Sequence, residues 1–311
     1  MNTPFFSIII PVFNREKLIS QTLNSVRNQC FKDFEVITVD DYSKDKSIDA
    51  IQSIINNDDR IKLIKHEKNK GRSAARNTGL NHAKGKWICY LDSDDIYEIN
   101  HLELFHQLIL ENPSYSCFAQ KSGVLGEEIM NNNNNNPSQS NEITFSDVLK
   151  TNLFVPNQIC HIKEIGVKWY EEISYSEDLL FIREILVNYS ILYSQNITNY
   201  LRIHEDRSMN RVSNDKFITD NIRAVNHLFM NYPKIELGFK KIIESRTHLI
   251  CLNLNYFEGY LNNKHLLKNI YSNIHTYYSY LFYLFIFKLI VLRPIKQLLV
   301  VVRRFIYKNW E

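Results

Sequence analysis

The chain has 311 residues, a formal net charge of +3 and a hydrophobic fraction of 44%. A chain of this length can bury a substantial core, and we expect one large α/β domain with a smaller appendage. The small net charge gives no indication of a nucleic-acid partner. The five cysteines are far apart and show no metal-ligand spacing, so we expect reduced thiols, mostly in the core, of a cytoplasmic protein.

Strand and helix patterns alternate over about the first 110 residues. Apolar runs predict strands at residues 6–11, 34–39, 61–66 and 87–91, and amphipathic patterns predict helices at about 16–29, 48–55 and 73–83. The first eleven residues lack a basic leader and a cleavage site, so we interpret them as holding the first strand and no signal peptide. The alternation predicts a parallel sheet with helices on both faces.

Polar side chains follow each predicted strand at its carboxyl end. They are Asn14, then Asp40 and Asp41, then Asn69 to Arg72, and then Asp92 to Asp95. Ligands of open α/β sheets bind at this edge, and the acids Asp92, Asp94 and Asp95 call for a cation there. The alternative is that these acids cap a helix that starts at Ile96. We expect this capping role only for Asp95.

The second half of the chain carries weaker patterns. We expect helices at residues 99–110 and 177–187, strands at 191–193 and 197–203, and helical structure from Asp215 onward. The asparagine run at 131–136 and the polar residues after it predict an exposed loop. Near the end, residues 277–292 and 298–302 are apolar and aromatic, with Lys and Arg interleaved. We expect helices that lie on a membrane surface, although core packing or a contact between copies is the alternative.

Four segments together resemble the ordered motifs of the family 2 glycosyltransferases with the GT-A fold. They are SIIIPVFN at 7–14, VDDYSKDKS at 39–47, NKGRSAARNTG at 69–79 and YLDSDD at 90–95. Glu177-Asp178 and the Arg202-Ile-His204…Ser208 element are similar to that family's later motifs. The resemblance covers roughly residues 5–210 and implies a Rossmann-like, mostly parallel sheet with helices on both faces, followed by a helical C-terminal region.

The resemblance divides the chain into three parts. A nucleotide-sugar-binding half would span residues 1–112, an acceptor-binding half with the loop 131–141 would span 113–212, and a membrane-associating helical region would span 213–311. Residues implied to contact the donor nucleotide are Pro11, Phe13, Asn14, Asp41, Gly71, Arg76, Asn77, Asp92, Ser93, Arg202 and Ser208. Asp41 would accept from an imide N–H of the base, which favours uracil, and Asp92 would contact the ribose. Tyr42 departs from the family, in which glycine is usual at this turn.

The remaining implied roles concern the reaction. Asp94 and His204 would bind Mn²⁺ or Mg²⁺, which stabilises the charge that develops on the leaving diphosphate. Asp178 would act as general base on the acceptor hydroxyl, and Glu177 would orient the acceptor. A single displacement inverts the anomeric centre, so an α-linked UDP-sugar would give a β-linked product. The alternatives are that the acid pair caps a helix and that His204 is a structural or surface residue.

We therefore expect a hexosyl- or N-acetylhexosaminyltransferase that extends a surface glycan such as capsule or O-antigen of lipopolysaccharide. Its acceptor would sit on a polyprenyl diphosphate at the inner face of the cytoplasmic membrane, and the C-terminal helices are also suited to joining copies into a homo-oligomer. One alternative is a non-catalytic sugar-nucleotide-binding scaffold. The other is a sugar nucleotidyltransferase, which Pro-Val-Phe-Asn after the first strand disfavours, because a triphosphate would need a glycine-rich basic loop there.

Overall fold

The computed structural model describes residues 3–126, 140–148, 154–205 and 213–235. These residues belong to a compact unit spanning Met1–Tyr260, and a second unit spans Leu261–Glu311. The predicted asparagine-rich loop, Ser208 and the aromatic C-terminal segments lie outside the described residues. Within the described ranges, no helix is long and apolar enough to cross a membrane.

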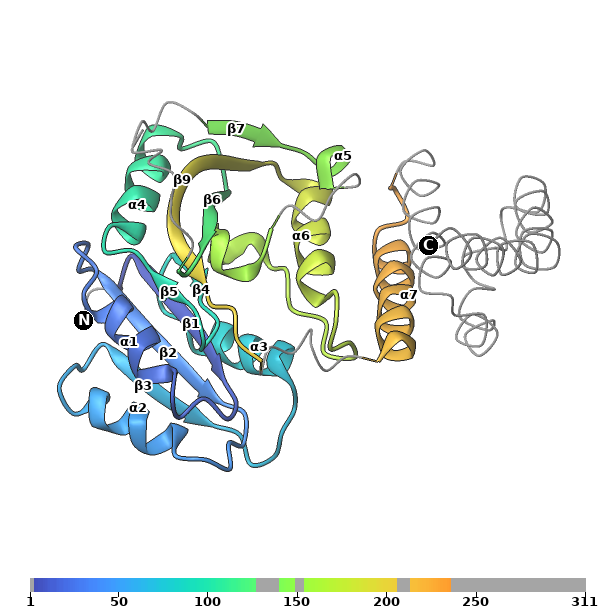
Figure 1. The fold of residues 1–311 in the computed structure, drawn as a ribbon. Coiled ribbons are helices and arrows are strands. Elements are labelled where there is room, and N and C mark those ends of the chain that lie inside the picture. The colour runs from blue at the N-terminus through green and yellow to red at the C-terminus, as the bar shows by residue number, and fades with distance from the viewer. Residues whose placement is uncertain (1–2, 127–139, 149–153, 206–212, 236–311) are drawn as a thin grey trace, which may run out of the picture. The chain divides into compact units, whose positions relative to one another are not determined.

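The first part of the chain alternates strands and helices as predicted (Figure 1). In order, the elements are β1 (Phe6–Val12), α1 (Ile19–Arg27), β2 (Phe34–Asp40), α2 (Ser47–Ile55), β3 (Ile61–Lys65), α3 (Arg72–His82) and β4 (Trp87–Tyr90). These strands pair in the order β3-β2-β1-β4, all in parallel. Their carboxyl ends therefore meet at one edge of the sheet, which is the prediction on which the site depends.

The side chains of β1 show why helices cover both faces of the sheet. Ile8 and Ile10 join Leu23 of α1 in a buried core that also holds apolar residues of α2 and of α4 (His101–Glu111). Ile9 points to the opposite face, where it meets Gly79 of α3. Successive residues of a strand face opposite sides, so a run of apolar residues is buried only when both faces are covered.

The second half of the sheet is mixed rather than parallel. Its strands are β5 (Ile96–Tyr97), β6 (Cys117–Val124), β7 (Ser140–Ile143), β8 (Ile159–Ile162) and β9 (Ile191–Leu201). β8 lies antiparallel between β4 and β6, and β9 is parallel to β6 but antiparallel to β5 and β7. The expectation of a mostly parallel sheet therefore holds for the first four strands only.

Three local predictions in this half were wrong. The two strands expected at 191–193 and 197–203 form the single strand β9, which stays continuous through a register shift opposite Gln120 and Lys121. Strands β6, β7 and β8 were not predicted, because their sequences lack clear two-residue alternation. Asp95 does not cap a helix, because it precedes strand β5, and α4 begins only at His101.

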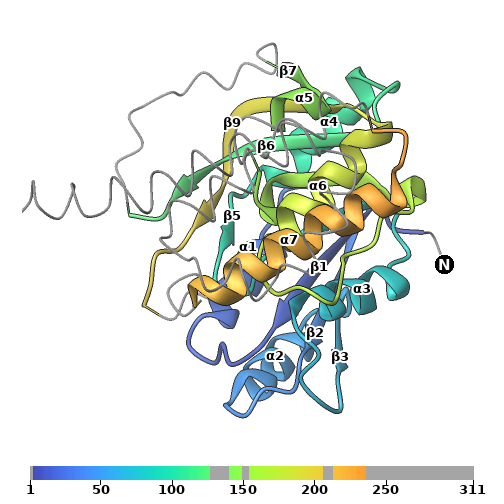
Figure 2. The same cartoon turned by 90° about the vertical axis from the view of Figure 1, so that its right-hand side faces the viewer.

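Helix α6 (Glu177–Asn188) begins at the predicted acid pair, and α7 (Asn214–Asn231) runs beside it (Figures 1 and 2). Glu184 Oε1 of α6 lies 3.2 Å from His227 Nε2 of α7. Asp220 of α7 also accepts hydrogen bonds from the backbone N–H groups of Ser174 and Tyr175, at 2.9 and 3.2 Å. Helix α7 thus packs within the unit that spans Met1–Tyr260.

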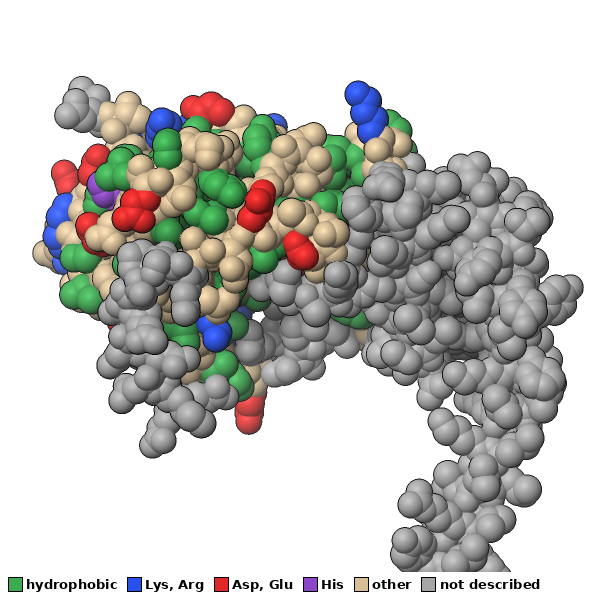
Figure 3. All heavy atoms as spheres, turned by 90° about the horizontal axis from the view of Figure 1, so that it is seen from above, with side chains coloured by type: hydrophobic (Ala, Val, Ile, Leu, Met, Phe, Trp, Pro, Cys, Tyr) green, Lys and Arg blue, Asp and Glu red, His purple; other side chains and the backbone are tan. Residues whose placement is uncertain are grey.

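Short elements complete the described chain. They are helix α5 (Phe145–Val148) and two 3₁₀ turns, η1 (Pro156–Gln158) and η2 (Lys163–Ile165). Cys89, Cys117 and Cys160 are buried free thiols, as predicted, whereas Cys30 is exposed and Cys251 lies outside the described residues. On the face shown in Figure 3, acidic, basic and hydrophobic side chains of the described residues are intermixed.

The close approach of α3 to the sheet predicts the effect of Gly79→Ala. A Cβ at this position would lie 2.4 Å from Ile9 Cγ2, so the substitution forces α3 away from β1. We expect urea denaturation to show a loss of about 1–3 kcal/mol, although alanine normally favours a helix. Asn81→Ala, at an exposed position of the same helix, is the control and should change stability by less than about 0.5 kcal/mol. Equal stability of the two variants would show that this contact does not limit α3.

Candidate active site

A cleft of about 560 Å³ opens at the carboxyl edge of the parallel strands. Its lining comes from the ends of β1, β2 and β4, the segment 69–76 that begins α3, Val155-Pro156, the segment 171–178 and Lys216 of α7. Pro11, Phe13, Asp41, Gly71, Arg76, Asp92, Ser93, Asp94, Glu177 and Asp178 all line it, as predicted for a shared site. Asn14, Asn77, Arg202 and His204 do not line the cleft.

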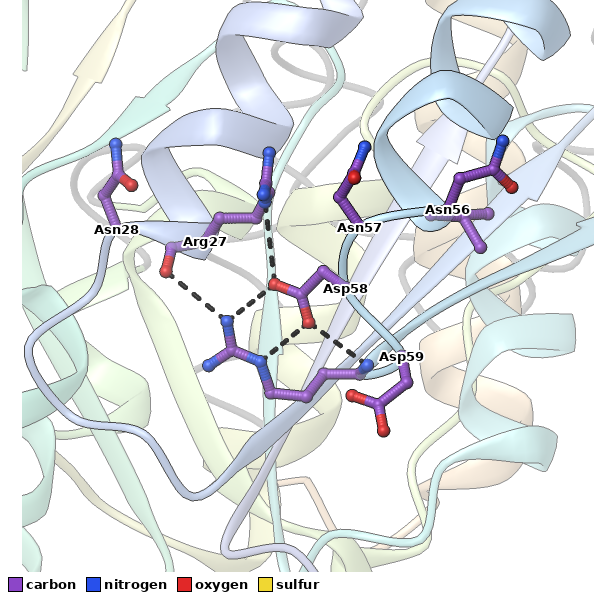
Figure 4. Close-up of a pocket in the computed structure, with 8 residues that line it drawn as sticks. Arg27, Asn28, Asn56, Asn57, Asp58 and Asp59 are labelled. Carbon is purple, nitrogen blue, oxygen red and sulfur yellow. Dashed lines mark hydrogen bonds and ion pairs between the residues drawn. The ribbon is translucent and has the colours of Figure 1, made fainter.

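A second hollow, of about 660 Å³, lies at the opposite edge of the sheet (Figure 4). It is formed by the end of α1 and the connection between α2 and β3, where Asp58 lies 2.6 Å from Arg60 Nη2 and 3.6 Å from Arg27 Nε. These charges neutralise one another and hold the connection in place. The candidate active site is therefore the cleft at the carboxyl edge.

Asp41 lies buried where the end of β2 meets the cleft. Its Oδ1 accepts from the backbone N–H of Lys70 and lies 2.8 Å from His66 Nδ1, and its Oδ2 accepts from the N–H of Gly71. Gly71 has φ of +90°, which glycine adopts without strain and which turns this N–H toward the carboxylate. The geometry explains why a glycine precedes α3 in the predicted motif.

The backbone of the neighbouring turn is also left-handed. Tyr42 has φ of +70°, and its exposed ring lies under Lys44, with Nζ 3.2 Å from the ring centroid. Glycine takes this conformation freely, whereas tyrosine incurs a cost of roughly 1 kcal/mol. Although tyrosine replaces the glycine that is usual in the family, the turn keeps the left-handed backbone that favours glycine.

The DSDD segment has a different partner for each acid. Asp92 Oδ1 lies 2.7 Å from Arg76 Nη2, and Asp94 Oδ2 lies 2.9 Å from His204 Nε2. Asp95 is buried, and its carboxylate accepts from the backbone N–H of Arg202 and from the Asn157 amide. Burial, together with Asp92 and Asp94, raises the pKa of Asp95 to about 8. Asp95 is thus a buried anchor that ties the end of β9 to this segment.

Arg76 lies at the centre of the cleft wall and is only 1% exposed. Its guanidinium contacts Asp92 on one side and Glu177 Oε1, at 3.4 Å, on the other, and it lies 4.3 Å from the ring centroid of Trp169. Burial favours the neutral form of Asp92, but Arg76 outweighs it and lowers the pKa of Asp92 below its ordinary value. The role predicted for Arg76, direct contact with the nucleotide, stays a prediction.

At the start of α6, Glu177 is buried near these arginines and Asp178 beside it is partly buried. Glu177 Oε1 lies 3.1 Å from Arg72 Nε, so Glu177 holds two guanidinium groups. Burial raises the pKa of Asp178 above its ordinary value, with Asp92 adding to the rise and Arg76 and Arg72 opposing it. A carboxylate with a raised pKa is a stronger base, as a proton acceptor at a reacting hydroxyl must be.

Three residues that were predicted to contact the donor nucleotide form hydrogen bonds within the protein. The Asn77 amide bonds the backbone of Trp169 at 2.8 and 2.9 Å and Glu171 Oε1 at 2.7 Å, and Asn14 Oδ1 accepts from the N–H of Lys44. Arg202 Nε donates to the carbonyl of Asp94, and its Nη2 donates to Gln21. These bonds tie the three residues to other segments of the chain beside the cleft.

Sequence reasoning gave no individual role to several residues in or beside the cleft. Arg15 follows the first motif, with Nη2 3.2 Å from Asp94 Oδ2, and Arg72 lies inside the third motif. A basic residue beside each acidic strand end is the signal that could have identified both. Asn157 and Lys216 gave no such signal, because only the fold brings these distant segments to the cleft.

Asp94 and His204 form a donor set that fits a divalent cation. One carboxylate oxygen and one imidazole nitrogen face each other at 2.9 Å, and Mn²⁺ accepts both ligand types. Among the described residues, no cluster of three His, Cys, Asp or Glu side chains could hold a metal ion by itself. A cation at this pair would therefore need further ligands, such as phosphate oxygens of a bound nucleotide.

Comparison with known proteins identifies the family. The family model for glycosyl transferase family 2 matches residues 7–173. An uncharacterised glycosyltransferase of Haemophilus influenzae is 34% identical over 206 residues, which cover 65% of this chain and 81% of the relative. The chain is a family 2 glycosyltransferase. The chain is also 37% identical over 133 residues to the Escherichia coli protein WfgD, which is named UDP-Glc:alpha-D-GlcNAc-diphosphoundecaprenol beta-1,3-glucosyltransferase. That match spans 43% of the chain and about half, 49%, of WfgD.

Solved structures confirm the GT-A fold of this glycosyltransferase. Staphylococcus aureus TarS 1–349 in complex with UDP-GlcNAc matches 85% of the chain and 79% of its own length, with a TM-score of 0.65 and 24% identity. The Pyrobaculum calidifontis mannosyltransferase PcManGT, solved with GDP-Man and Mn²⁺, matches 80% of the chain and 70% of its own length, with a TM-score of 0.53 and 18% identity. At these identities the likeness establishes the fold alone.

The burial of Arg76 predicts a large loss of stability in Arg76→Met. This change leaves the buried Glu177 and the partly buried Asp92 without their shared cation, and loss of one partner of a buried ion pair costs about 3–5 kcal/mol. Chemical denaturation at neutral pH would measure the loss. Arg60→Met in the hollow of Figure 4 is the control, because its partly exposed pair with Asp58 contributes about 1 kcal/mol or less. A similar loss in the two variants would contradict the central role of Arg76.

Proposed function

We propose that this glycosyltransferase is an inverting, cation-dependent enzyme that transfers a sugar from a UDP-sugar to a hydroxyl of a lipid-linked glycan, forming a β-glycosidic bond. The observation that carries the proposal is the meeting of Asp92, Asp94 and Asp178 in one cleft. The first two come from the end of β4 and the third from α6. Donor-binding and proton-accepting carboxylates are therefore available to one bound sugar.

The residues at the sheet edge would bind the donor. Asp41 would accept from the imide N–H of uracil, the exposed ring of Phe13 would pack on the base, and Asp92 would bond the ribose. Asp94 and His204 would hold Mn²⁺ or Mg²⁺ together with the diphosphate, and the cation would neutralise charge on the leaving group. Arg15 and Arg72 would supply further positive charge near the diphosphate.

Asp178 would take the proton from the acceptor hydroxyl as that oxygen attacks the anomeric carbon. Arg76 and Arg72 bind Glu177, so they fix the beginning of α6 and with it the position of Asp178. No covalent enzyme intermediate is needed in a single displacement. The predicted role of Glu177 in orienting the acceptor would have to use groups that the arginines leave available.

The acceptor and location are proposed from the relatives and the sequence together. WfgD is named for a sugar acceptor on diphosphoundecaprenol, which supports a glycan on a polyprenyl diphosphate as acceptor here. Such a carrier places the reaction at the inner face of the cytoplasmic membrane. The apolar and basic C-terminal segments would then bind the headgroup region, or join two copies of the chain. We propose that the enzyme adds a sugar during the assembly of a surface polysaccharide.

Asp178→Asn should abolish sugar transfer while leaving donor binding intact. The amide cannot accept the proton, so we expect kcat to fall at least about a thousandfold, with the Kd for UDP within about twofold of wild type. Transfer is measured with UDP-sugars and a polyprenyl-diphosphate-linked acceptor. Glu172→Gln, an exposed nearby change, is the control and should retain wild-type turnover. Near-normal kcat in Asp178→Asn would exclude this residue as the base.

The pH dependence of transfer provides a second measurement on Asp178. A general base must be ionised, so a raised pKa means that activity is lost at a higher pH as the solution is acidified. We expect kcat/KM to fall on the acid side with an apparent pKa above the ordinary aspartate value of about 4. An acid limb at or below that value would contradict the proposed environment of Asp178.

The cation site predicts that Asp94→Ala and removal of divalent ions have the same effect. Each should reduce the rate of transfer at least about a hundredfold, because charge on the departing diphosphate is no longer neutralised. The assay compares chelator-treated protein, with and without added Mn²⁺, and Asp59→Ala in the distant hollow serves as the control. Full activity of chelator-treated wild-type protein would overturn the proposed cation dependence.

A further inference from the structure

His66 lies beside Asp41, which lines the cleft, without lining the cleft itself. It follows β3 directly, its backbone N–H donates to the carbonyl of Asp40 at 2.9 Å, and its side chain is 4% exposed. The imidazole bridges two elements: Nδ1 lies 2.8 Å from Asp41 Oδ1, and Nε2 lies 2.9 Å from the hydroxyl of Thr78 on α3. The ring is thus fixed at both nitrogens.

The contact with Asp41 defines the direction of the hydrogen bond. An ionised carboxylate can only accept, so Nδ1 must carry a proton and donate it to Oδ1. The N–H groups of Lys70 and Gly71 also donate to this carboxylate, each at 2.8 Å. Among the described residues, His66 is the side chain that donates to it.

These three bonds leave little freedom at Asp41. A carboxylate offers about four acceptor sites, so three donors leave about one for a ligand. Because Asp41 lines the cleft, that last site is available to a group bound there. The two backbone donors hold one edge of the carboxylate, and His66 completes the set that orients its plane.

We propose that His66 is a positioning residue for base recognition. It fixes the Asp41 carboxylate so that the remaining acceptor site meets a ring N–H, and so sets the preference for uracil over cytosine, whose ring nitrogen at that position is itself an acceptor. His66 acts through Asp41, since it does not line the cleft. The inference rests on the proposed use of a uridine donor.

Two substitutions separate the two ring nitrogens. The amide nitrogen of His66→Asn takes the place of Nδ1 and still donates to Asp41, whereas that of His66→Gln reaches toward Thr78 instead. Calorimetric titration of the full chain with UDP and with CDP, in Mn²⁺, measures recognition without turnover. We expect His66→Gln to weaken UDP binding about tenfold and His66→Asn to weaken it by less than about threefold, with the Kd for CDP unchanged in both.

Other outcomes would overturn the inference. Equal weakening by the two substitutions would mean that His66 only fills space, and an unchanged ratio of UDP to CDP affinity would exclude a role in base choice. If a His66 variant does not fold, Thr78→Val removes the support at Nε2, and unchanged UDP affinity there would also count against the proposal. A wild-type chain that prefers UDP but transfers no sugar would contradict the proposed reaction and leave the assignment of His66 intact.

Discussion

The buried guanidinium of Arg76 joins the two sides of the cleft. Asp92 belongs to the sheet edge and is partly buried, whereas Glu177 at the start of α6 is a buried acid that would be costly to ionise alone. Arg76 can reach both because α3 packs directly on β1, where Gly79 leaves room for Ile9. The closeness of one helix to one strand therefore sets the distance between the carboxylates of the site.

The two halves of the sheet contribute differently to this arrangement. The parallel half presents strand ends, and their polar residues form the wall that would hold the nucleotide. The mixed half contributes hydrogen bonds from distant segments. Asn157 accepts from the N–H of Asp92 at 2.8 Å and donates to Asp95, and the N–H of Arg202 donates to Asp95. The DSDD segment is consequently held from both sides, which restricts the motion of Asp94 between its neighbours.

The sequence was sufficient to predict the parallel half, and ten of the site residues that it indicated line the cleft. Buried strands such as β1 are continuous apolar runs, and the polar residues after them have a position that topology alone determines. The mixed half was harder to predict, because β8 has only four residues, β6 passes through register shifts, and both strands are held by neighbours on both sides. For a related reason Asp95 was wrongly expected to cap a helix, and the bonds that Asn77 and Arg202 make to other segments were not foreseen. A polar side chain in a motif does not reveal whether it faces a ligand or bonds another segment, and only the folded chain supplies Trp169 or Asn157 as a partner.

Helix α6 begins after the last residue of the segment that the family model matches, residue 173. Asp178 and Glu177, which are proposed to act on the acceptor, thus belong to a stretch of chain separate from the motifs proposed for nucleotide binding. Because they touch the donor side mainly through Arg72 and Arg76, the acceptor side can accumulate substitutions without disturbing the nucleotide pocket. Such a division gives evolution a way to exchange the glycan that is extended while the activated sugar stays the same.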